Sequence, residues 1–93
     1  MNKKVFKYVL RIDDRITLNL PKGAEVLTVQ TQYNQPCLWV LVDPFAAKEK
    51  RVFRLAGTGH PISFDMGSDY KYINSFQMDD GALVFHLFEM LGI

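Results

Sequence analysis

The segment Gly57-Thr58-Gly59-His60-Pro61 has the composition in this chain that best suits ligand binding. Two glycines around a threonine let backbone N–H groups come close to an anion or a carbonyl oxygen, because no Cβ atom intervenes. His60 adds a donor that changes charge near neutral pH. The alternative is structural: the glycines only permit a sharp corner between strands, with His60 at the surface. The segment is not a dinucleotide-binding fingerprint, because a third glycine and a following helix are missing, and it lacks the Gly-Lys-Ser/Thr ending of a P-loop.

Polar side chains on nearby strands extend this candidate site. Gln30 and Gln32 fall on one face of an expected strand, and Arg54 lies on a later strand. Amide and guanidinium groups on a sheet face can bind a base edge or a phosphate. Such residues also occur simply as the solvated face of a sheet. The predicted ligand-binding set is Arg54, Gly57, Thr58, Gly59, His60, Gln30 and Gln32.

The residues suited to catalysis or metal binding form no recognisable set. Cys37 is the only cysteine, and with His60 or His86 it makes the only obvious nucleophile and base pair. Its apolar surroundings instead predict a packed thiol. No nucleophile-elbow motif surrounds Ser63, Ser68 or Ser75. The two histidines and the cysteine lack metal-ligand spacing. We therefore expect no catalytic centre, no metal and no other cofactor. The apolar segment around His86 favours a core or interface histidine that is bonded to a neighbour.

Composition limits the class of protein. A length of 93 residues indicates one domain, residues 1–93, and 48% hydrophobic with 23% charged residues is ordinary for a globular protein. A net charge of +1 gives no footprint for nucleic acid or an anionic membrane. No apolar run indicates a signal peptide or a membrane span. A single cysteine fits a reducing cytoplasm.

The stretch Glu25–Pro44 should position these residues, because it reads as two long strands joined by a turn at Asn34-Gln35-Pro36. Residues Cys37–Val42 are apolar at every position, which predicts a central strand covered on both faces. A hairpin of this kind is not stable alone in water, so the remaining segments should pack around it.

Alternation of apolar and polar residues predicts the other strands at Val5–Ile12, Arg15–Leu20, Arg51–Leu55 and Tyr70–Met78. The first two should pair as a hairpin, in a meander, while Phe45–Lys50 favours one helical turn and Ile62–Asp69 reads as a loop. Ala82–Leu91 fits a buried strand or a C-terminal helix, and the turn Asp79-Asp80-Gly81 favours the strand. Together these segments predict an all-β fold, a small antiparallel β-sandwich or partly open barrel of about seven strands. Exposed edges in such a fold favour a homo-oligomer.

A series of motifs carries a family resemblance: Pro21-Lys22-Gly23-Ala24, then CLW-x-LVDP at 37–44, GTGHPI at 57–62 and GALVFH at 81–86. In this order the chain resembles the small uncharacterised proteins encoded by tailed bacteriophages and prophages. The resemblance implies a phage accessory protein that acts in the host cytoplasm and is not a building block of the virion. Phage proteins of this size often act by binding, so the resemblance implies either sequestration of a host nucleotide signal used in defence or occlusion of a host protein.

The expected function is therefore that of a non-enzymatic, anti-defence binding protein for a small anionic or nucleotide-like ligand. The alternative is a protein-interaction module that inhibits a host protein through a sheet face or an edge strand. A small hydrolase is a third possibility that no set of acid, base and nucleophile supports.

Overall fold

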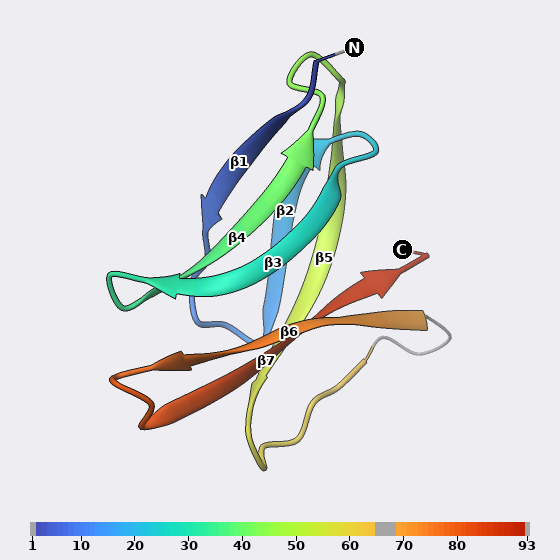
Figure 1. Cartoon of the computed structure of the whole chain (residues 1–93). Helices are drawn as coiled ribbons and strands as arrows, with labels where there is room; N and C mark the ends of the chain where they lie inside the picture. Colours follow the sequence, from blue (N-terminus) through green and yellow to red (C-terminus); the bar gives the residue numbers. More distant parts are fainter. Residues whose placement is uncertain (1, 65–68, 93) are drawn as a thin grey trace.

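The computed structural model describes residues 2–64 and 69–92, and these form seven strands in two antiparallel sheets (Figure 1). Sheet A has the strand order β1-β4-β3 and sheet B the order β2-β5-β7-β6. The described residues contain no helix, and the two sheets do not close into a barrel, so the predicted all-β fold is confirmed. The strands are β1 (Lys4–Val9), β2 (Arg15–Pro21), β3 (Glu25–Gln32), β4 (Gln35–Val42), β5 (Lys48–Gly57), β6 (Asp69–Met78) and β7 (Leu83–Leu91).

The central hairpin of β3 and β4 is present, and β4 is the middle strand of sheet A as predicted. Val29 and Leu38 face each other across it and are both fully buried. The predicted position of the turn, Asn34-Gln35-Pro36, is wrong: the turn lies at Tyr33 and Asn34, and Gln35 already begins β4. Both turn residues have positive φ, 52° and 57°, which is the backbone that matches the twist of a tight hairpin.

The predicted hairpin between the first two strands is wrong. β1 pairs with β4, from Lys4 opposite Val42 to Val9 opposite Cys37, whereas β2 pairs with β5. Because β4 is apolar on both faces, it is best placed inside a sheet with a neighbour on each side. The chain between β1 and β2 therefore crosses from sheet A to sheet B. At this corner the Leu10 amide donates to Pro36 O (2.8 Å) and the Leu55 amide donates to Asp14 O (3.2 Å).

The connections after β4 correct one prediction and confirm another. The helical turn expected at Phe45–Lys50 is absent: a tight turn closed by the Ala46 amide on Asp43 O (3.1 Å) leads directly into β5. The last segment is a strand, because β7 pairs with β5 on one side and β6 on the other. The expected loop at Ile62–Asp69 is irregular at 62–64, residues 65–68 lie outside the described part, and Asp69 begins β6.

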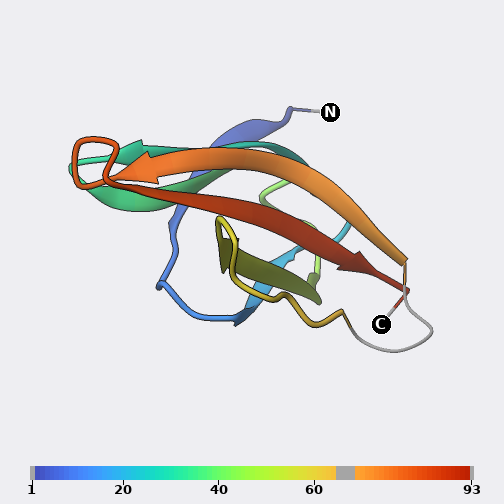
Figure 2. The ribbon, with the colours of Figure 1, turned by 90° about the horizontal axis from the view of Figure 1, so that it is seen from below.

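The two sheets approach each other along β3 and β6, and the core lies between them (Figure 2). Side chains and not a backbone ladder join these two strands. The Asn74 amide donates to Thr28 Oγ1 (3.0 Å) and Val29 O (3.3 Å), and the Thr31 hydroxyl donates to Gln77 O. On the opposite side β1 and β2 are not paired with each other, so the sandwich is open there. Fully buried side chains between the sheets include Leu20, Val29, Leu38, Val40, Val42, Phe53 and Leu87.

Candidate functional site

The face of sheet B that points away from sheet A collects most of the polar and aromatic side chains with ligand-binding potential. Strand register places Arg54 opposite Phe88, and Phe88 opposite Tyr72. In the next row Ala56 lies opposite His86, and His86 opposite Ser75. The residues between these positions on the same strands point to the core. We call this surface the sheet B face and define it by Arg54, Thr58, Tyr70, Tyr72, Ser75, His86 and Phe88.

His86 is the centre of a chain of hydrogen bonds on the sheet B face. Its Nε2 lies 2.7 Å from Thr58 Oγ1, and its Nδ1 lies 2.7 Å from Ser75 Oγ. Ser75 Oγ is in turn 2.6 Å from the Tyr72 hydroxyl. The half-buried imidazole therefore joins the turn after β5 to strand β6, which agrees with the expectation of a histidine bonded to its neighbours.

The proton positions in this series of hydrogen bonds depend on the contact between Thr58 and Val84 O. Thr58 Oγ1 lies 3.5 Å from Val84 O, which can only accept a hydrogen bond. If Thr58 donates to Val84 O, it accepts from His86 Nε2–H, so Nδ1 accepts from the Ser75 hydroxyl and Ser75 accepts from Tyr72. In that arrangement the neutral ring would carry its proton on Nε2 and would use both ring nitrogens.

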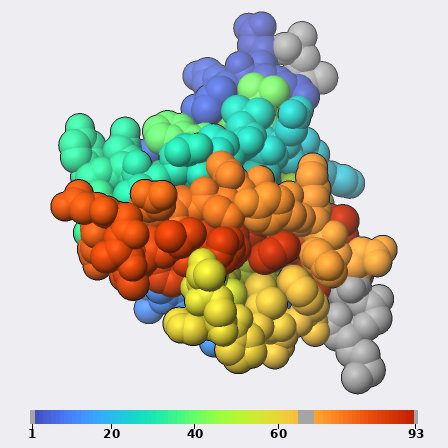
Figure 3. Space-filling view, turned by 60° about the horizontal axis from the view of Figure 1, so that its bottom comes forward, coloured from blue at the N-terminus to red at the C-terminus, as the bar shows by residue number. Residues whose placement is uncertain are grey.

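Aromatic rings form a second part of the sheet B face. Phe64 stacks on Tyr70 with ring centroids 4.1 Å apart and an interplanar angle of 5°, and it meets Phe88 edge-on at 5.4 Å. Tyr72 packs against Phe88 at 5.5 Å. Tyr70 and Tyr72 are nevertheless 53% and 52% exposed, so their rings are available for stacking. Figure 3 shows the yellow segment after β5 lying against β7 on this side of the molecule.

The turn Gly57–Pro61 brings Thr58 into the sheet B face but uses two of its amides internally. The Thr58 amide donates to Val84 O (3.1 Å), and the His60 amide donates to Gly57 O (3.0 Å). Gly59 has φ +82°, a conformation that favours glycine. At Gly57 an added Cβ would lie 3.0 Å from His60 Nδ1, so the exposed His60 ring packs over this glycine. Two amides of this turn are therefore already bonded within the protein.

A cleft of 320 Å³ beside this turn is lined by Gly57 and His60, and also by Asp13 and Asp14. Two carboxylates are unfavourable neighbours for a negatively charged ligand. The cleft is therefore a poor place for an anion. Arg54 lies on the outward face of sheet B and lines a separate pocket that contains one of these carboxylates, Asp14.

Gln30 and Gln32 lie elsewhere. The Gln30 amide donates to Thr28 Oγ1 (3.1 Å), and Gln32 Oε1 accepts from Lys7 Nζ (2.8 Å), which also lies over the Trp39 ring. Both glutamines thus belong to the outward face of sheet A, on the other side of the core from Arg54. The structure brings Arg54 and Thr58 onto one face and does not bring Gln30 or Gln32 to it.

Cys37 is 1% exposed, with Sγ 3.6 Å from Gln35 O, which confirms the prediction of a packed thiol. Of the serines considered as nucleophiles, Ser75 is hydrogen-bonded to His86. Ser68 lies outside the described residues. Across residues 2–64 and 69–92, no three His, Cys, Asp or Glu side chains gather closely enough to hold a metal ion.

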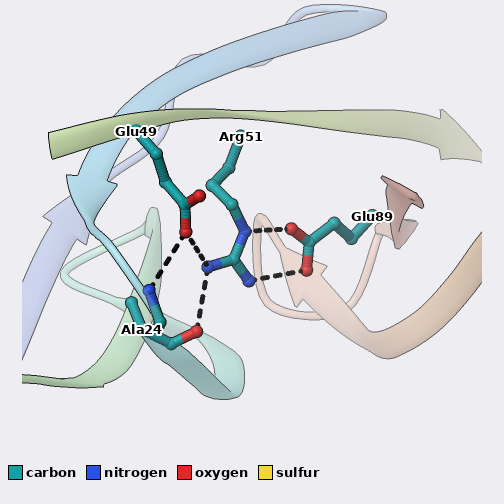
Figure 4. A network of polar contacts seen from close by, with 5 residues as sticks. Ala24, Glu49, Arg51 and Glu89 are labelled. Carbon is teal, nitrogen blue, oxygen red and sulfur yellow. Dashed lines mark hydrogen bonds and ion pairs between the residues drawn. The ribbon is translucent and has the colours of Figure 1, made fainter. Parts of the chain in front are cut away.

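Sequence reasoning missed the pair of Arg51 and Glu89 at one end of the core (Figure 4). Arg51 binds Glu89 through Nε and through Nη2 (3.0 Å), and its Nη1 donates to Ala24 O (2.9 Å). Their side chains are only 18% and 7% exposed. The hydrogen bond to Glu89 outweighs burial and raises the pKa of Arg51, with further help from the charges of Glu89 and Glu49. The signal in the sequence was Glu89 itself, a lone acidic residue in the apolar run ALVFHLFEML, which indicates a buried carboxylate with a partner.

The pair forms the floor of a cleft of 390 Å³ between β3 and β6, with Lys71 and Tyr72 at its β6 side. Because Arg51 and Glu89 neutralise each other and share two hydrogen bonds, their arrangement fits a structural role at the end of the sandwich.

A family model described as a domain of unknown function matches residues 1–92. No curated protein and no solved structure matches the chain. Within the described residues there is no helix with the length and hydropathy that crossing a bilayer requires.

Proposed function

The chain belongs to the family of the DUF7352 domain of unknown function, and we propose that it is a non-enzymatic protein that binds a small anionic, nucleotide-like ligand on the sheet B face. The observation that carries this proposal is the cross-strand row of Arg54, Phe88 and Tyr72 beside the hydrogen-bonded chain around His86. A cation, exposed rings and hydroxyls are groups that can bind the phosphate, the base and the sugar of a nucleotide.

Each part of the ligand has a matching group. The exposed rings of Tyr70 and Tyr72 offer planar surfaces on which a base stacks, an interaction that tolerates any base. Arg54 supplies the guanidinium group that suits a phosphate. Thr58 and Ser75, held by His86, present hydroxyls at fixed positions for a sugar or a base edge.

Side chains and not the glycine turn carry this proposal. The amides of Thr58 and His60 already donate to protein carbonyls. The part assigned to Gly57, Gly59 and His60 is therefore to hold Thr58 in position at the corner. Gln30 and Gln32 have no part in it, because they lie on the opposite side of the core.

The proposed setting comes from the motif series. A tailed-phage or prophage accessory protein acting in the host cytoplasm would sequester a nucleotide signal that the host uses in defence, and a homo-oligomer would offer several copies of the site. Capture without turnover suits such a role, since binding alone lowers the free concentration of a signal.

Calorimetric titration tests the ligand class. The probes are adenosine monophosphate, adenosine, a cyclic dinucleotide and inorganic phosphate, each added to the intact chain, with native mass spectrometry reporting the number of subunits and of bound ligands. Binding of a phosphorylated nucleoside and not of adenosine or phosphate alone is the expected result. Weaker binding of the phosphorylated nucleosides by Arg54→Gln, through the phosphate, and by Tyr72→Ala, through the base, would assign the two halves of the site.

The matched control is Gln32→Ala, which removes a polar side chain from the opposite side of the core and should leave nucleotide binding unchanged. Circular dichroism and thermal unfolding establish that each variant is folded. Equal binding by folded Arg54→Gln, Tyr72→Ala and wild-type protein, or no binding of any phosphorylated probe, would reject the proposal.

A further inference from the structure

The strand order leaves β1 at the margin of sheet A, with β4 as its sole partner among the described strands. β2 has the same position in sheet B, where it pairs with β5. Both margins face the open side of the sandwich, and the short corner from Leu10 to Asp14 joins them (Figure 1). An edge strand presents backbone N–H and C=O groups that another strand can pair with.

A groove of 230 Å³ lies between the end of β1 and the start of β2. Leu10 and Ile16 are buried in it, while Leu18 is half-buried. Its charged lining residues are Arg11, Arg15 and Asp13, two cations to one carboxylate. On the outward side of β1 the apolar Val5 and Val9 are 55% and 52% exposed, as is Ile12 at the corner, with 50%. An added strand would cover apolar surface here as well as pair its backbone.

Charge is distributed unevenly and favours one kind of partner at β1. Residues 2–12 contain Lys3, Lys4, Lys7 and Arg11 and no acidic residue. This leaves seven Lys and Arg against ten Asp and Glu in residues 13–93. The net charge of +1 for the whole chain is therefore the sum of a positive segment, residues 2–12, and a negative remainder, residues 13–93. Lys3, Lys4, Lys7 and Arg11 are all exposed.

We propose that β1 accepts an extended acidic segment of another protein as an added strand, in the seam beside β2. Backbone pairing with β1 supplies the affinity, as in other cases of strand addition. Alternate apolar side chains of the segment cover the groove on the core side. Its carboxylates lie on the outward side, beside Lys7 and Arg11, while Lys3 and Lys4 add to the positive field at this edge. This site lies apart from the sheet B face and goes beyond the nucleotide proposal.

The charge pattern argues against a second copy of this chain as the occupant. Pairing β1 with β1 of another copy brings the same four cations to the seam, and like charges on neighbouring strands are destabilising. An acidic partner instead neutralises them. Attraction of this kind is screened by salt, so binding should weaken as ionic strength rises.

The test uses a labelled peptide of about eight residues in which valine and glutamate alternate, a length typical of one strand. Two peptides are matched to it: one with lysine in place of every glutamate, and one with two central valines replaced by proline, which lacks the N–H donor. Fluorescence anisotropy at low salt gives the affinities. NMR spectra of the intact chain, with amide hydrogen exchange, locate the bound peptide.

The matched variants reverse two charges each. Lys4→Glu with Arg11→Glu acts at the proposed edge, and Lys22→Glu with Lys50→Glu changes the net charge equally at exposed positions outside it. We expect the first pair to weaken binding of the acidic peptide by roughly tenfold or more and the second pair by much less. Amides of β1 should shift and gain protection from exchange on binding.

Several outcomes would overturn the proposal: equal binding of the lysine or proline peptide, equal effects of the two variant pairs, shifts confined to other strands, or no binding of the acidic peptide. Concentration-dependent dimerisation that Lys4→Glu with Arg11→Glu alters would identify a second copy as the occupant and would equally reject it. Because none of these readouts uses a nucleotide, failure here leaves the sheet B face proposal standing.

Discussion

Asn34 and Asp79, 45 residues apart in the chain, fasten the tips of the two long hairpins to each other. The Asn34 amide donates to Asp79 Oδ1 (2.8 Å), and the Asp79 backbone amide donates to Asn34 Oδ1 (2.9 Å). One hairpin belongs to sheet A and the other to sheet B. The pair thus closes the end of the β3 and β6 border, where the sheets are joined by side chains alone.

We predict that Asn34→Gly lowers the free energy of unfolding by about 1 kcal/mol, because glycine keeps the positive φ of the turn but loses both hydrogen bonds. Asn34→Ala should cost about 1 kcal/mol more, since alanine also disfavours φ 57°. Urea unfolding of both variants measures the difference. Wild-type stability of Asn34→Gly would mean that the contact between the hairpin tips contributes nothing.

Tyr33 occupies the first turn position with φ 52° and a side chain that is 91% exposed. A large residue is strained in this region, and no buried contact compensates for the strain. We predict that Tyr33→Gly or Tyr33→Asn raises the free energy of unfolding by roughly 0.5 to 1 kcal/mol. A higher melting temperature in differential scanning calorimetry is the expected result, and a lower one would assign a stabilising role to the tyrosine ring.

The Arg51 and Glu89 pair should behave as a unit. Glu89→Gln removes the charge opposite a mostly buried guanidinium group, and we expect a loss of roughly 3 kcal/mol in the free energy of unfolding. The double change Arg51→Met with Glu89→Leu removes both charges and should cost much less. Urea unfolding of the single and double variants gives the coupling energy. Additive losses would contradict a coupled pair.

Alkaline pH gives a second test of the same pair. Folding raises the pKa of Arg51, so its contribution to stability is complete below the unfolded-state pKa and is lost only as pH rises through the higher folded-state value. Both values lie far above pH 10. The stability difference between the wild type and Arg51→Met should therefore stay constant from pH 7 to about pH 10. A difference that shrinks across this interval would contradict the assignment.

Much of this fold is predictable because the strand pattern is local. Alternation identified most of the strands, and the fully apolar run Cys37–Val42 predicted the central strand of sheet A. The pairing of the strands was harder to predict from the sequence. β1 and β2 are consecutive and amphipathic, so their pattern fits a hairpin as well as a crossing between the two sheets. The choice depends on β4 and its need for two neighbours, which is a property of the assembled sheet.

The candidate site shows the same division. Arg54 and Thr58 were selected by residue type, and the structure places them on one face. Tyr72 and Ser75 were missed because each looks ordinary within an alternating strand. Only the pairing of β6 with β7 brings Ser75 to His86. Gln30 and Gln32 were assigned to the same site because strand alternation fixes a face within one sheet but not which of two sheets carries it.

Our last prediction concerns the proton on His86. The hydrogen bonds from Tyr72 through Ser75 and His86 to Thr58 end at Val84 O, an acceptor, so neutral His86 should carry its proton on Nε2. Nitrogen-15 chemical shifts of the neutral imidazole distinguish the two forms. Ser75→Ala removes the donor to Nδ1 and should weaken the preference, whereas Tyr72→Phe leaves Ser75 free to donate to Nδ1 and should preserve it. A proton on Nδ1 would reverse the donor and acceptor in each of these hydrogen bonds, with Thr58 donating to the ring and Ser75 donating to Tyr72.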